Sequence, residues 1–338
     1  MKKHKINELK NLLSESKNII ITAHRNPDGD AIGSSLALMH VLEKLGHSVL
    51  VVFPTNYAHF LKWLPGNEKV LVFVDSKEES ISKISNADLI FCLDFNALNR
   101  LDEMEQHIKI SSAQKIMIDH HQNPEDFADI VFSDTNACAT AELLYNLLKD
   151  LDYIDLLDEH SGTCIYTGIM TDSGSFKFSS TTSGTHLITS KLFDLGVNHT
   201  LVHEKVLANN KPSQLKMLGY VLSEKLDILP ALNTAIISLT NSELIKFDNE
   251  KGDTEGFVNY PLSISGIKLS AFFVERGNKI KISFRSKGSF KTNILASKYF
   301  EGGGHVNASG GTSYKSMKET IDYFKSVLTS FNDELTSN

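Results

Sequence analysis

This 338-residue chain is poor in cysteine and contains no long apolar run. Its three cysteines, Cys92, Cys138 and Cys164, are widely spaced, which argues against a disulfide framework and a cysteine-based zinc site. The longest apolar runs fall well short of the roughly 20 residues needed to cross a bilayer. The basic residues 1–5 lead into an amphipathic stretch rather than an apolar signal core. We therefore expect a cytoplasmic protein that does not associate with membranes.

The chain also lacks an excess of basic residues. It has 34 Lys and Arg against 41 Asp and Glu, for a formal net charge of −7. Proteins that coat long nucleic acids bind through many Lys and Arg contacts to phosphate, so no long-duplex partner is expected. A small anionic substrate is still compatible with this composition if metal ions and a local basic patch supply positive charge.

The order of apolar and polar segments predicts an α/β fold. A chain of this length usually forms two domains. Apolar strand-like runs at 19–23, 49–53, 89–93 and 116–118 alternate with helical patterns at about 30–45 and 139–148. Such alternation is typical of βαβ units, so the N-terminal domain should contain a mainly parallel sheet.

The rest of the chain predicts a smaller α/β domain. We expect an N-terminal domain over 1–198, a helical linker over 199–226 and a C-terminal domain over 227–338. Strands are predicted at 235–239, 267–274 and 279–284, with a hairpin at 276–278 between the last two. Helices should follow at about 292–300 and 316–328, and residues 332–338 should form a frayed tail.

Three of the apolar runs end in side chains that bind metals. The first leads into His24, Asp28 and Asp30, the second into Asp94, and the third into Asp119-His120-His121. Open α/β sheets place their ligands beyond the carboxyl ends of parallel strands, so these side chains should converge. Asp172 follows a further apolar stretch and could complete the set.

Each of these residues also has a purely structural interpretation. Asp30 could cap the helix that follows it, and Asp94 could be an ordinary turn residue. Isolated histidines are more often ordinary surface or core residues, and we interpret four of them in this way: His160, His186, His199 and His203. Three consecutive ligand-type residues after one strand, Asp119 to His121, are harder to explain by packing.

The predicted ligands are oxygens and imidazoles without thiolates. This donor set suits Mn²⁺ best, with Mg²⁺, Co²⁺ or Fe²⁺ as alternatives. Two such ions bridged by one carboxylate would polarise phosphoryl oxygens and acidify a water molecule. The sequence therefore predicts a hydrolase of phosphoesters that uses two divalent metal ions.

The motifs together resemble those of the DHH phosphoesterases. The resemblance rests on Asp119-His120-His121, on the segment 24–34 (HRNPDGDAIGS), on Asp94, on 167–174 (TGIMTDSG) and on 302–310 (GGGHVNASG). These motifs occur in the family's order over nearly the whole chain. Within the family, the length and domain order are most similar to the oligoribonuclease/3′-phosphoadenosine 5′-phosphate phosphatases, or nanoRNases.

The resemblance implies particular roles for the N-terminal motifs. One ion would be held by His24, Asp28 and Asp94, and the other by Asp30, Asp94, His120 and Asp172. Asp94 would thus bridge the two ions. Asp119 would orient neighbouring groups, and His121 would contact the scissile phosphate or orient ligands. The resemblance also places the active site in the cleft between the two domains.

Candidate substrate contacts lie mostly in the C-terminal domain. The glycines Gly302, Gly303 and Gly304 would let backbone N–H groups form an anion-binding nest, and His305 would add a donor. Arg285-Ser286 follows an apolar strand, and the guanidinium of Arg285 could grip a terminal phosphate. Arg100, six residues beyond Asp94, is a further candidate phosphate contact.

We therefore expect Mn²⁺-dependent hydrolysis of RNA of two to five nucleotides to mononucleotides, and of 3′-phosphoadenosine 5′-phosphate to AMP and phosphate. A cyclic-dinucleotide or pApA phosphodiesterase is the alternative enzyme. A RecJ-like exonuclease and a DHH pyrophosphatase fit less well, the first because of the acidic composition and the second because of the glycine motif. A catalytically inactive nucleotide-binding regulator is the alternative outside enzymes. The sequence leaves a homodimer open.

Overall fold

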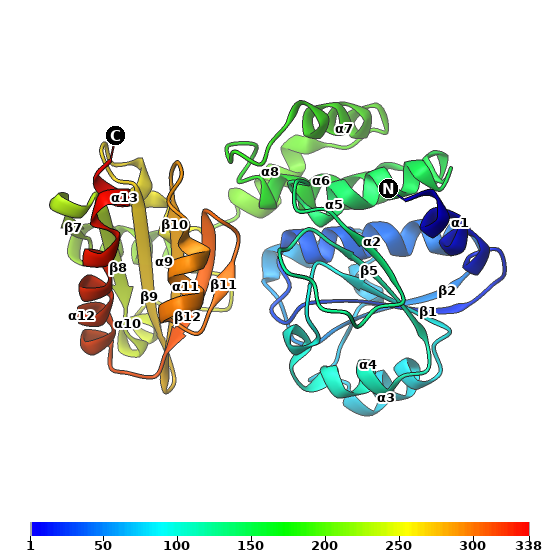
Figure 1. The fold of residues 1–338 in the computed structure, drawn as a ribbon, viewed down its shortest axis with the longest axis horizontal. Helices are drawn as coiled ribbons and strands as arrows, with labels where there is room; N and C mark the ends of the chain where they lie inside the picture. Colours follow the sequence, from blue (N-terminus) through cyan, green and yellow to red (C-terminus); the bar gives the residue numbers. More distant parts are fainter. Residues whose placement is uncertain (1, 338) are drawn as a thin grey trace. The chain divides into compact units, whose positions relative to one another are not determined.

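The computed structural model describes residues 2–337 and divides into two compact units between Asn209 and Asn210. Figure 1 traces both along the chain. The segment predicted as a linker, 199–226, is helical and contains this boundary. Helix α8 (His199–Leu207) contributes Val202 to the core of the first unit, and α9 (Pro212–Glu224) contributes Met217 and Val221 to a core of the second.

The first unit is built on a six-stranded sheet. Every strand pairing in it is parallel, and the strand order is β3-β2-β1-β4-β5-β6. The strands are β1 (Asn18–Ala23), β2 (Ser48–Phe53), β3 (Leu71–Val72), β4 (Leu89–Leu93), β5 (Gln114–Asp119) and β6 (Ile130–Ser133). The predicted mainly parallel sheet is therefore confirmed. The order reverses between β1 and β4, and such a switch point is where α/β sheets place their ligands.

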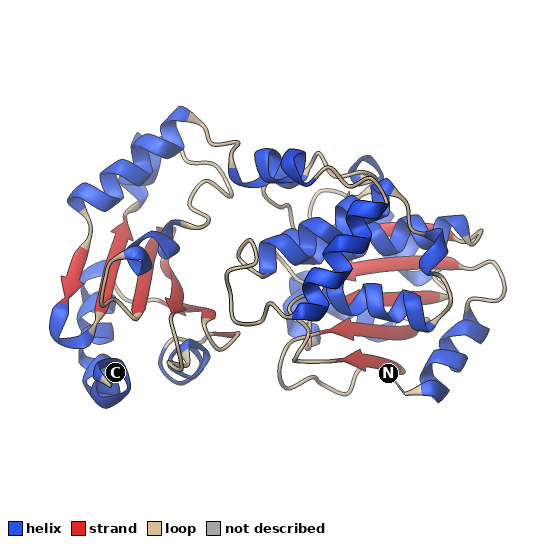
Figure 2. Cartoon of the chain, turned by 90° about the horizontal axis from the view of Figure 1, so that it is seen from above, coloured by secondary structure: helices blue, strands red, loops and turns tan. Residues whose placement is uncertain are grey.

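Helices cover both faces of this sheet (Figures 1 and 2). One face carries α1 (Lys3–Leu12), α2 (Gly29–Lys44), α5 (Thr140–Asp150), α6 (Glu159–Asp172), α7 (Ser183–Asp194) and α8. The other carries α3 (Lys77–Ser85), η3 (Leu98–Met104) and α4 (Glu105–Ile110). Short 3-10 turns complete the unit: η1 (His59–Leu61), η2 (Asn67–Lys69) and η4 (Ile154–Leu156). The two buried apolar clusters on either side of the sheet explain why its strands are apolar on both faces.

Two glycines allow α2 and α6 to approach closely. A Cβ atom on Gly33 would lie 2.4 Å from the carbonyl oxygen of Cys164, and one on Gly168 would lie 2.8 Å from a carboxylate oxygen of Asp30. Both glycines therefore occupy positions where any side chain would force the helices apart. This close crossing brings the start of α2 to the end of α6, where Asp172 is the last residue.

The second unit contains a sheet of order β11-β12-β10-β9-β8-β7. The strands are β7 (Asp227–Leu229), β8 (Thr234–Leu239), β9 (Leu269–Arg276), β10 (Lys279–Ser286), β11 (Gly303–Gly304) and β12 (Ala308–Ser313). Strands β8 and β9 are parallel and the other pairs are antiparallel. The predicted hairpin joins β9 to β10 through Gly277, which has a φ of 62°.

Helices also cover both faces of the second sheet. On one side lie α11 (Thr292–Tyr299), α12 (Met317–Leu328), η5 (Pro230–Leu232), η7 (Thr329–Phe331) and α13 (Asn332–Thr336). On the other lie α9, α10 (Asn241–Lys246) and η6 (Phe257–Ser263). No helix within residues 2–337 has both the length and the apolar character needed to span a membrane.

The predicted frayed tail is wrong for most of its length. Residues 332–336 form α13, and Leu335 is fully buried in the core beside α12. Asn233 also donates a side-chain hydrogen bond to the Leu335 carbonyl, at 2.9 Å. Burial of Leu335 and the hydrogen bond from the Asn233 side chain to its carbonyl thus hold this polar segment in place. Asn338 lies outside the described residues.

Candidate metal centre

The turn between β1 and α2 holds His24 and Asp28 together. Asp28 is the N-cap of α2, because its Oδ1 accepts the backbone N–H groups of Asp30 and Ala31, both at 3.1 Å. The capping role considered for Asp30 therefore belongs to Asp28. The other carboxylate oxygen of Asp28 lies 3.9 Å from Nε2 of His24, whose Nδ1 is 2.8 Å from the Arg25 carbonyl.

Asp94 lies at the end of β4 and is almost fully buried. Its backbone has a φ of 61°, which is uncommon for a residue other than glycine. Its two carboxylate oxygens point to different neighbours. Oδ2 is 3.4 Å from Nε2 of His24, whereas Oδ1 is 3.6 Å from Nε2 of His120 and 3.7 Å from Nδ1 of His121.

The N-terminus of α5 binds Asp30, a contact that the sequence did not predict. The Asp30 carboxylate accepts the backbone N–H of Thr140 at 2.6 Å and that of Ala141 at 2.9 Å. The first turn of α5 has no side-chain cap of its own, so Asp30 satisfies two N–H groups that would otherwise lack partners. The Thr140 hydroxyl donates to Oδ1 of Asp94, at 2.9 Å.

His120 follows β5 and has its two ring nitrogens in different surroundings. Nδ1 lies 3.0 Å from the Ala137 carbonyl, while Nε2 lies 3.3 Å from Asp172 and 3.9 Å from Asp30. A proton on Nδ1 would donate to the carbonyl and leave the Nε2 lone pair directed at the carboxylates. Metal-binding histidines are commonly oriented by such a carbonyl.

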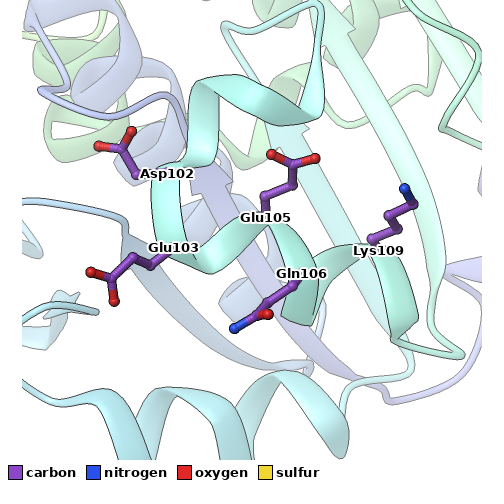
Figure 3. A pocket seen from close by; sticks show the side chains of 5 residues that line it. All are labelled: Asp102, Glu103, Glu105, Gln106 and Lys109. Atoms are coloured by element: carbon purple, nitrogen blue, oxygen red, sulfur yellow. The ribbon is translucent and has the colours of Figure 1, made fainter.

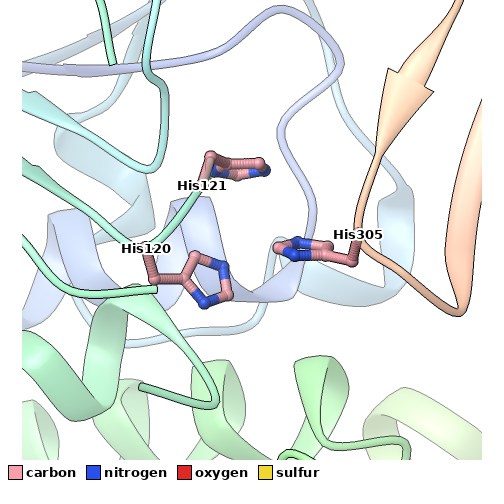
Figure 4. Close-up of side chains that lie close together, drawn as sticks. All are labelled: His120, His121 and His305. Atoms are coloured by element: carbon pink, nitrogen blue, oxygen red, sulfur yellow. The ribbon is translucent and has the colours of Figure 1, made fainter. Parts of the chain in front are cut away.

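His121 is held by Asp119, the last residue of β5. The Asp119 carboxylate accepts the backbone N–H of His121 at 3.1 Å, and its other oxygen lies 2.7 Å from the ring Nδ1. The rings of His120 and His121 pack edge to face (Figure 4), and their centroids lie 5.1 Å apart. The pair therefore presents two differently oriented imidazoles at the end of one strand.

The predicted ligands of the first unit thus lie together. Ligand atoms within 4.8 Å of one another define three groups: His24 with Asp28 and Asp94, Asp30 with His120 and Asp172, and Asp94 with Asp119 and His121. These groups supply oxygen and imidazole donors, a combination suited to Mn²⁺, Mg²⁺ or Fe²⁺. Most of these converging donors are buried, and the set fits divalent cations. Asp94 belongs to two of the groups.

The electrostatics of the carboxylates favour binding of cations. Burial, together with the charges of Asp28 and Asp94, raises the pKa of Asp172 to about 7. Burial and the charges of Asp94 and Asp172 raise the pKa of Asp30 well above its usual range. Against the effect of burial, the bond to His24 and the charges of nearby histidines lower the pKa of Asp94. Divalent cations would relieve this repulsion among acids.

The acids also raise the pKa of the two histidines that face them. Burial lowers the pKa of His24, but its hydrogen bond to Asp94 and the Asp28 charge outweigh burial and raise it. The charges of Asp172 and Asp94 likewise raise the pKa of His120. Binding of a cation at this site would therefore compete with binding of protons.

Arg100 lies close enough to the site to act on His24. Its positive charge lowers the pKa of that histidine, and its carbonyl accepts the backbone N–H of Arg25, at 2.7 Å. Arg25 in turn pairs with Asp102, at 2.5 Å. A surface hollow nearby is lined by Asp102, Glu103, Glu105, Gln106 and Lys109 (Figure 3). None of the predicted ligands lines this hollow, so it is distinct from the candidate metal centre.

Four other histidines lie outside these ligand groups. His186 stacks on Phe176 with ring centroids 5.4 Å apart, and Nε2 of His203 lies 3.1 Å from the Tyr166 hydroxyl. His199 packs on Phe193, and His160 packs edge to face on His40. Ring packing, and for His203 the contact with the Tyr166 hydroxyl, thus accounts for the positions of all four.

In the second unit, the predicted substrate contacts lie along neighbouring strands. Arg285 on β10 pairs with Ala308 on β12, and β12 pairs with Gly303 and Gly304 of β11. Ser286 accepts a hydrogen bond from the Asn307 side chain, at 2.8 Å, which fastens β10 to the turn after His305. Arg285, Ser286 and the glycine motif are therefore adjacent within this unit.

Gly303 and Gly304 form the short strand β11, which Gly302 precedes, and the anion-binding nest stays a prediction. A Cβ on Gly302 would lie 1.9 Å from the Gly310 carbonyl oxygen, and one on Gly304 would lie 2.7 Å from that of Ala308. Gly304 also has a φ of 134°. Close packing on β12 therefore explains two of the glycines. Gly303 is exposed, with nothing within 4 Å of an added Cβ, so close packing does not explain a glycine there.

Two family profiles match the chain, one in each unit. The profile described as "DHH family, N-terminal domain" matches residues 18–169, and the DHHA1 domain matches residues 233–334. The first match includes all the predicted metal ligands except Asp172. The second includes Arg285 and the glycine motif.

Named relatives cover both units. The chain is 30% identical to the bifunctional oligoribonuclease and PAP phosphatase NrnA of Bacillus subtilis, over 91% of this chain and 93% of that protein. It is 28% identical to the cyclic-di-AMP phosphodiesterase GdpP of the same species, over 95% of this chain but 49% of that protein. A crystal structure of an exopolyphosphatase-related protein from Bacteroides fragilis is 41% identical, with a TM-score of 0.94 and coverage of 99% of this chain and 98% of that one.

Proposed function

This chain belongs to the DHH family of phosphoesterases and is therefore a hydrolase, and we propose that it cleaves very short RNA and 3′-phosphoadenosine 5′-phosphate with the help of two divalent metal ions. The RNA would have two to five nucleotides and would be converted to mononucleotides. The second substrate would yield AMP and phosphate. We further propose that the enzyme acts in the cytoplasm and that Mn²⁺ is the preferred ion.

One observation carries the proposed chemistry: the two carboxylate oxygens of Asp94 face different groups of ligands. Oδ2 faces His24, and Oδ1 faces His120. One carboxylate could thus be shared by two cations, with His24 and Asp28 on one side and with Asp30, His120 and Asp172 on the other. When bound, such ions would polarise phosphoryl oxygens and acidify a water molecule.

The protein's own residues would orient the ligands and bind the substrate. The Ala137 carbonyl and the Arg25 carbonyl hold Nδ1 of His120 and of His24, so that Nε2 of each ring faces the acids. Asp119 holds His121 by its ring Nδ1, which leaves Nε2 as the atom that would face the scissile phosphate. Arg285, Ser286, Gly303 and His305 would bind another phosphate of the substrate, and Arg100 would add positive charge beside His24.

The choice of substrates rests on the relatives. The B. subtilis bifunctional enzyme matches this chain over nearly the full length of both proteins, which supports the same pair of activities. The cyclic-di-AMP phosphodiesterase supports the alternative, hydrolysis of cyclic dinucleotides or of linear pApA. This chain spans 49% of that relative, so we place the alternative second.

The decisive experiment supplies metal-stripped protein with or without Mn²⁺. The substrate panel contains RNA of two to seven nucleotides, pApA, a cyclic dinucleotide, long single-stranded DNA, pyrophosphate and 3′-phosphoadenosine 5′-phosphate. We expect Mn²⁺-dependent release of mononucleotides from the shortest RNAs and of AMP from the last substrate. Preference for the cyclic dinucleotide or long DNA would overturn the substrate assignment. Tight nucleotide binding without turnover would instead indicate a regulator.

The matching variant is Asp94→Ala. Removal of the shared carboxylate should abolish turnover of dinucleotides while circular dichroism shows an intact fold. Full activity in this variant would exclude the mechanism proposed for the site. Lys318→Ala, at an exposed position on α12, is the control and should retain wild-type rates.

A further inference from the structure

Thr140 contacts both sides of the candidate metal centre. It is the first residue of α5 and is fully buried. Its backbone N–H donates to Asp30 at 2.6 Å, and its hydroxyl donates to Oδ1 of Asp94 at 2.9 Å. One residue outside the ligand groups is thus hydrogen-bonded to two of their carboxylates.

We propose that Thr140 is a positioning residue that fixes the rotation of the Asp94 carboxylate, so that one of its oxygens serves each cation. This inference rests on the proposed function, because it assumes that two ions share Asp94. Thr140 itself would touch neither substrate nor metal.

The Thr140 hydroxyl can restrain the Asp94 carboxylate because it donates a hydrogen bond to Oδ1. An aspartate carboxylate can rotate about its side-chain bonds, and Oδ2 of Asp94 already lies 3.4 Å from His24. A donor on Oδ1 opposes rotation that would turn both oxygens toward His24. The β-branched side chain of Thr140 has restricted χ1, and its own N–H is anchored on Asp30, so the donor is held in place.

The effect should be asymmetric between the two ions. The segment 137–141 also supplies the Ala137 carbonyl to His120 and the Ala141 N–H to Asp30. Its contacts therefore converge on the group of Asp30, His120 and Asp172, while His24 is oriented separately through the Arg25 carbonyl. Loss of the hydroxyl should weaken binding of the ion on the His120 side. Binding of the ion on the His24 side should be nearly unchanged.

The test is Thr140→Val, which keeps the shape and the backbone N–H but removes the hydroxyl, with Thr140→Ser as the conservative variant. Thr189→Val is the matched control, because Thr189 is also buried but donates its hydroxyl within its own helix, to the Thr185 carbonyl at 2.9 Å. Mn²⁺ binding to metal-stripped protein is measured by titration calorimetry, and spin coupling between the two ions by electron paramagnetic resonance.

We expect wild type, Thr140→Ser and Thr189→Val to bind two Mn²⁺ ions with a spin-coupled spectrum. Thr140→Val should bind the first ion with wild-type affinity and the second at least tenfold more weakly, as changes in residues that orient ligands typically do. At one equivalent of excess Mn²⁺, its spectrum should be that of isolated ions.

Two results would overturn the role of Thr140. One is a Thr140→Val variant with two ions of wild-type affinity and an unchanged coupled spectrum. The other is an equal loss at both sites that Thr140→Ser shares, together with a lowered melting temperature of the metal-free protein, which would indicate a merely structural role. If wild type itself fails to bind a coupled pair, the proposed two-metal function fails first.

Discussion

Asp119 holds His121 at two points. Its carboxylate accepts the backbone N–H of His121 at 3.1 Å and lies 2.7 Å from the ring Nδ1. Asp119 is fully buried, and it ends β5, so both its backbone and its side chain are restrained. The imidazole is thereby fixed in orientation, with Nε2 as its outward nitrogen.

We predict that Asp119→Asn lowers kcat by about 10- to 100-fold, the range typical of groups that orient a ligand or catalytic residue. The amide can accept one of the two hydrogen bonds, but its NH₂ group would face a donor. Steady-state kinetics on a dinucleotide gives the rate, and calorimetry should show Mn²⁺ affinity close to wild type. A wild-type kcat would mean that the orientation of His121 does not matter for turnover.

We predict that the metal-free protein becomes less stable as the pH rises from about 4 to about 7. Burial and neighbouring acids raise the pKa of Asp172 to about 7, whereas an unfolded aspartate titrates near 3.9. Within this window the folded state keeps a proton that the unfolded state has lost. This contribution to the free energy of unfolding is therefore fully present below the window and is lost as the pH rises through it.

Asp172→Asn should flatten that part of the pH dependence, because the amide does not ionise. Urea unfolding of both metal-stripped proteins at pH 5 and pH 8 measures the difference. If wild type and Asp172→Asn lose equal stability between pH 5 and pH 8, Asp172 is not the group responsible. Asp155→Asn, at an exposed position on η4 outside the ligand groups, serves as the control.

We predict that Gly33→Ala destabilises the first unit by about 1–3 kcal/mol, the usual cost of overpacking. The new methyl would lie 2.4 Å from the Cys164 carbonyl oxygen, so α2 and α6 would have to separate. That movement would also pull Asp30 away from Asp172 and weaken Mn²⁺ binding. Chemical denaturation and calorimetry test both effects.

Gly219→Ala provides the control for this substitution. Gly219 lies within α9 and has nothing within 4 Å of an added Cβ. Alanine there should stabilise the protein by about 0.5–1 kcal/mol, because glycine loses more conformational freedom in a helix. Equal stability changes at the two positions would contradict the tight crossing of α2 and α6.

We predict that Arg285→Ala raises KM for short RNA roughly tenfold, since a hydrogen bond between charged groups is worth about 1.5 kcal/mol or more. Binding of Mn²⁺ should not change, because Arg285 and the metal ligands belong to different units. Lys318→Ala again serves as the surface control. An unchanged KM with a reduced kcat would indicate that Arg285 acts in the chemical step rather than in substrate binding.

The sequence by itself determined that the candidate metal ligands follow the ends of neighbouring strands. The apolar runs at 19–23, 89–93 and 116–118 became neighbouring parallel strands, and their polar ends became neighbours because parallel strands end at the same edge. The hairpin between β9 and β10 was equally predictable, because a glycine turn between two alternating strands is a local signal.

Tertiary structure decided which hydrogen bonds orient the polar side chains at those strand ends. Asp30 receives the N–H of Thr140 from 110 residues away, and no local pattern reveals that contact, because it depends on the packing of α2 beside α5. Leu335 likewise orders a polar tail only by entering the core of the second unit. Strand periodicity and turn chemistry act between near neighbours in sequence, whereas hydrogen bonds that orient carboxylates depend on which helices meet.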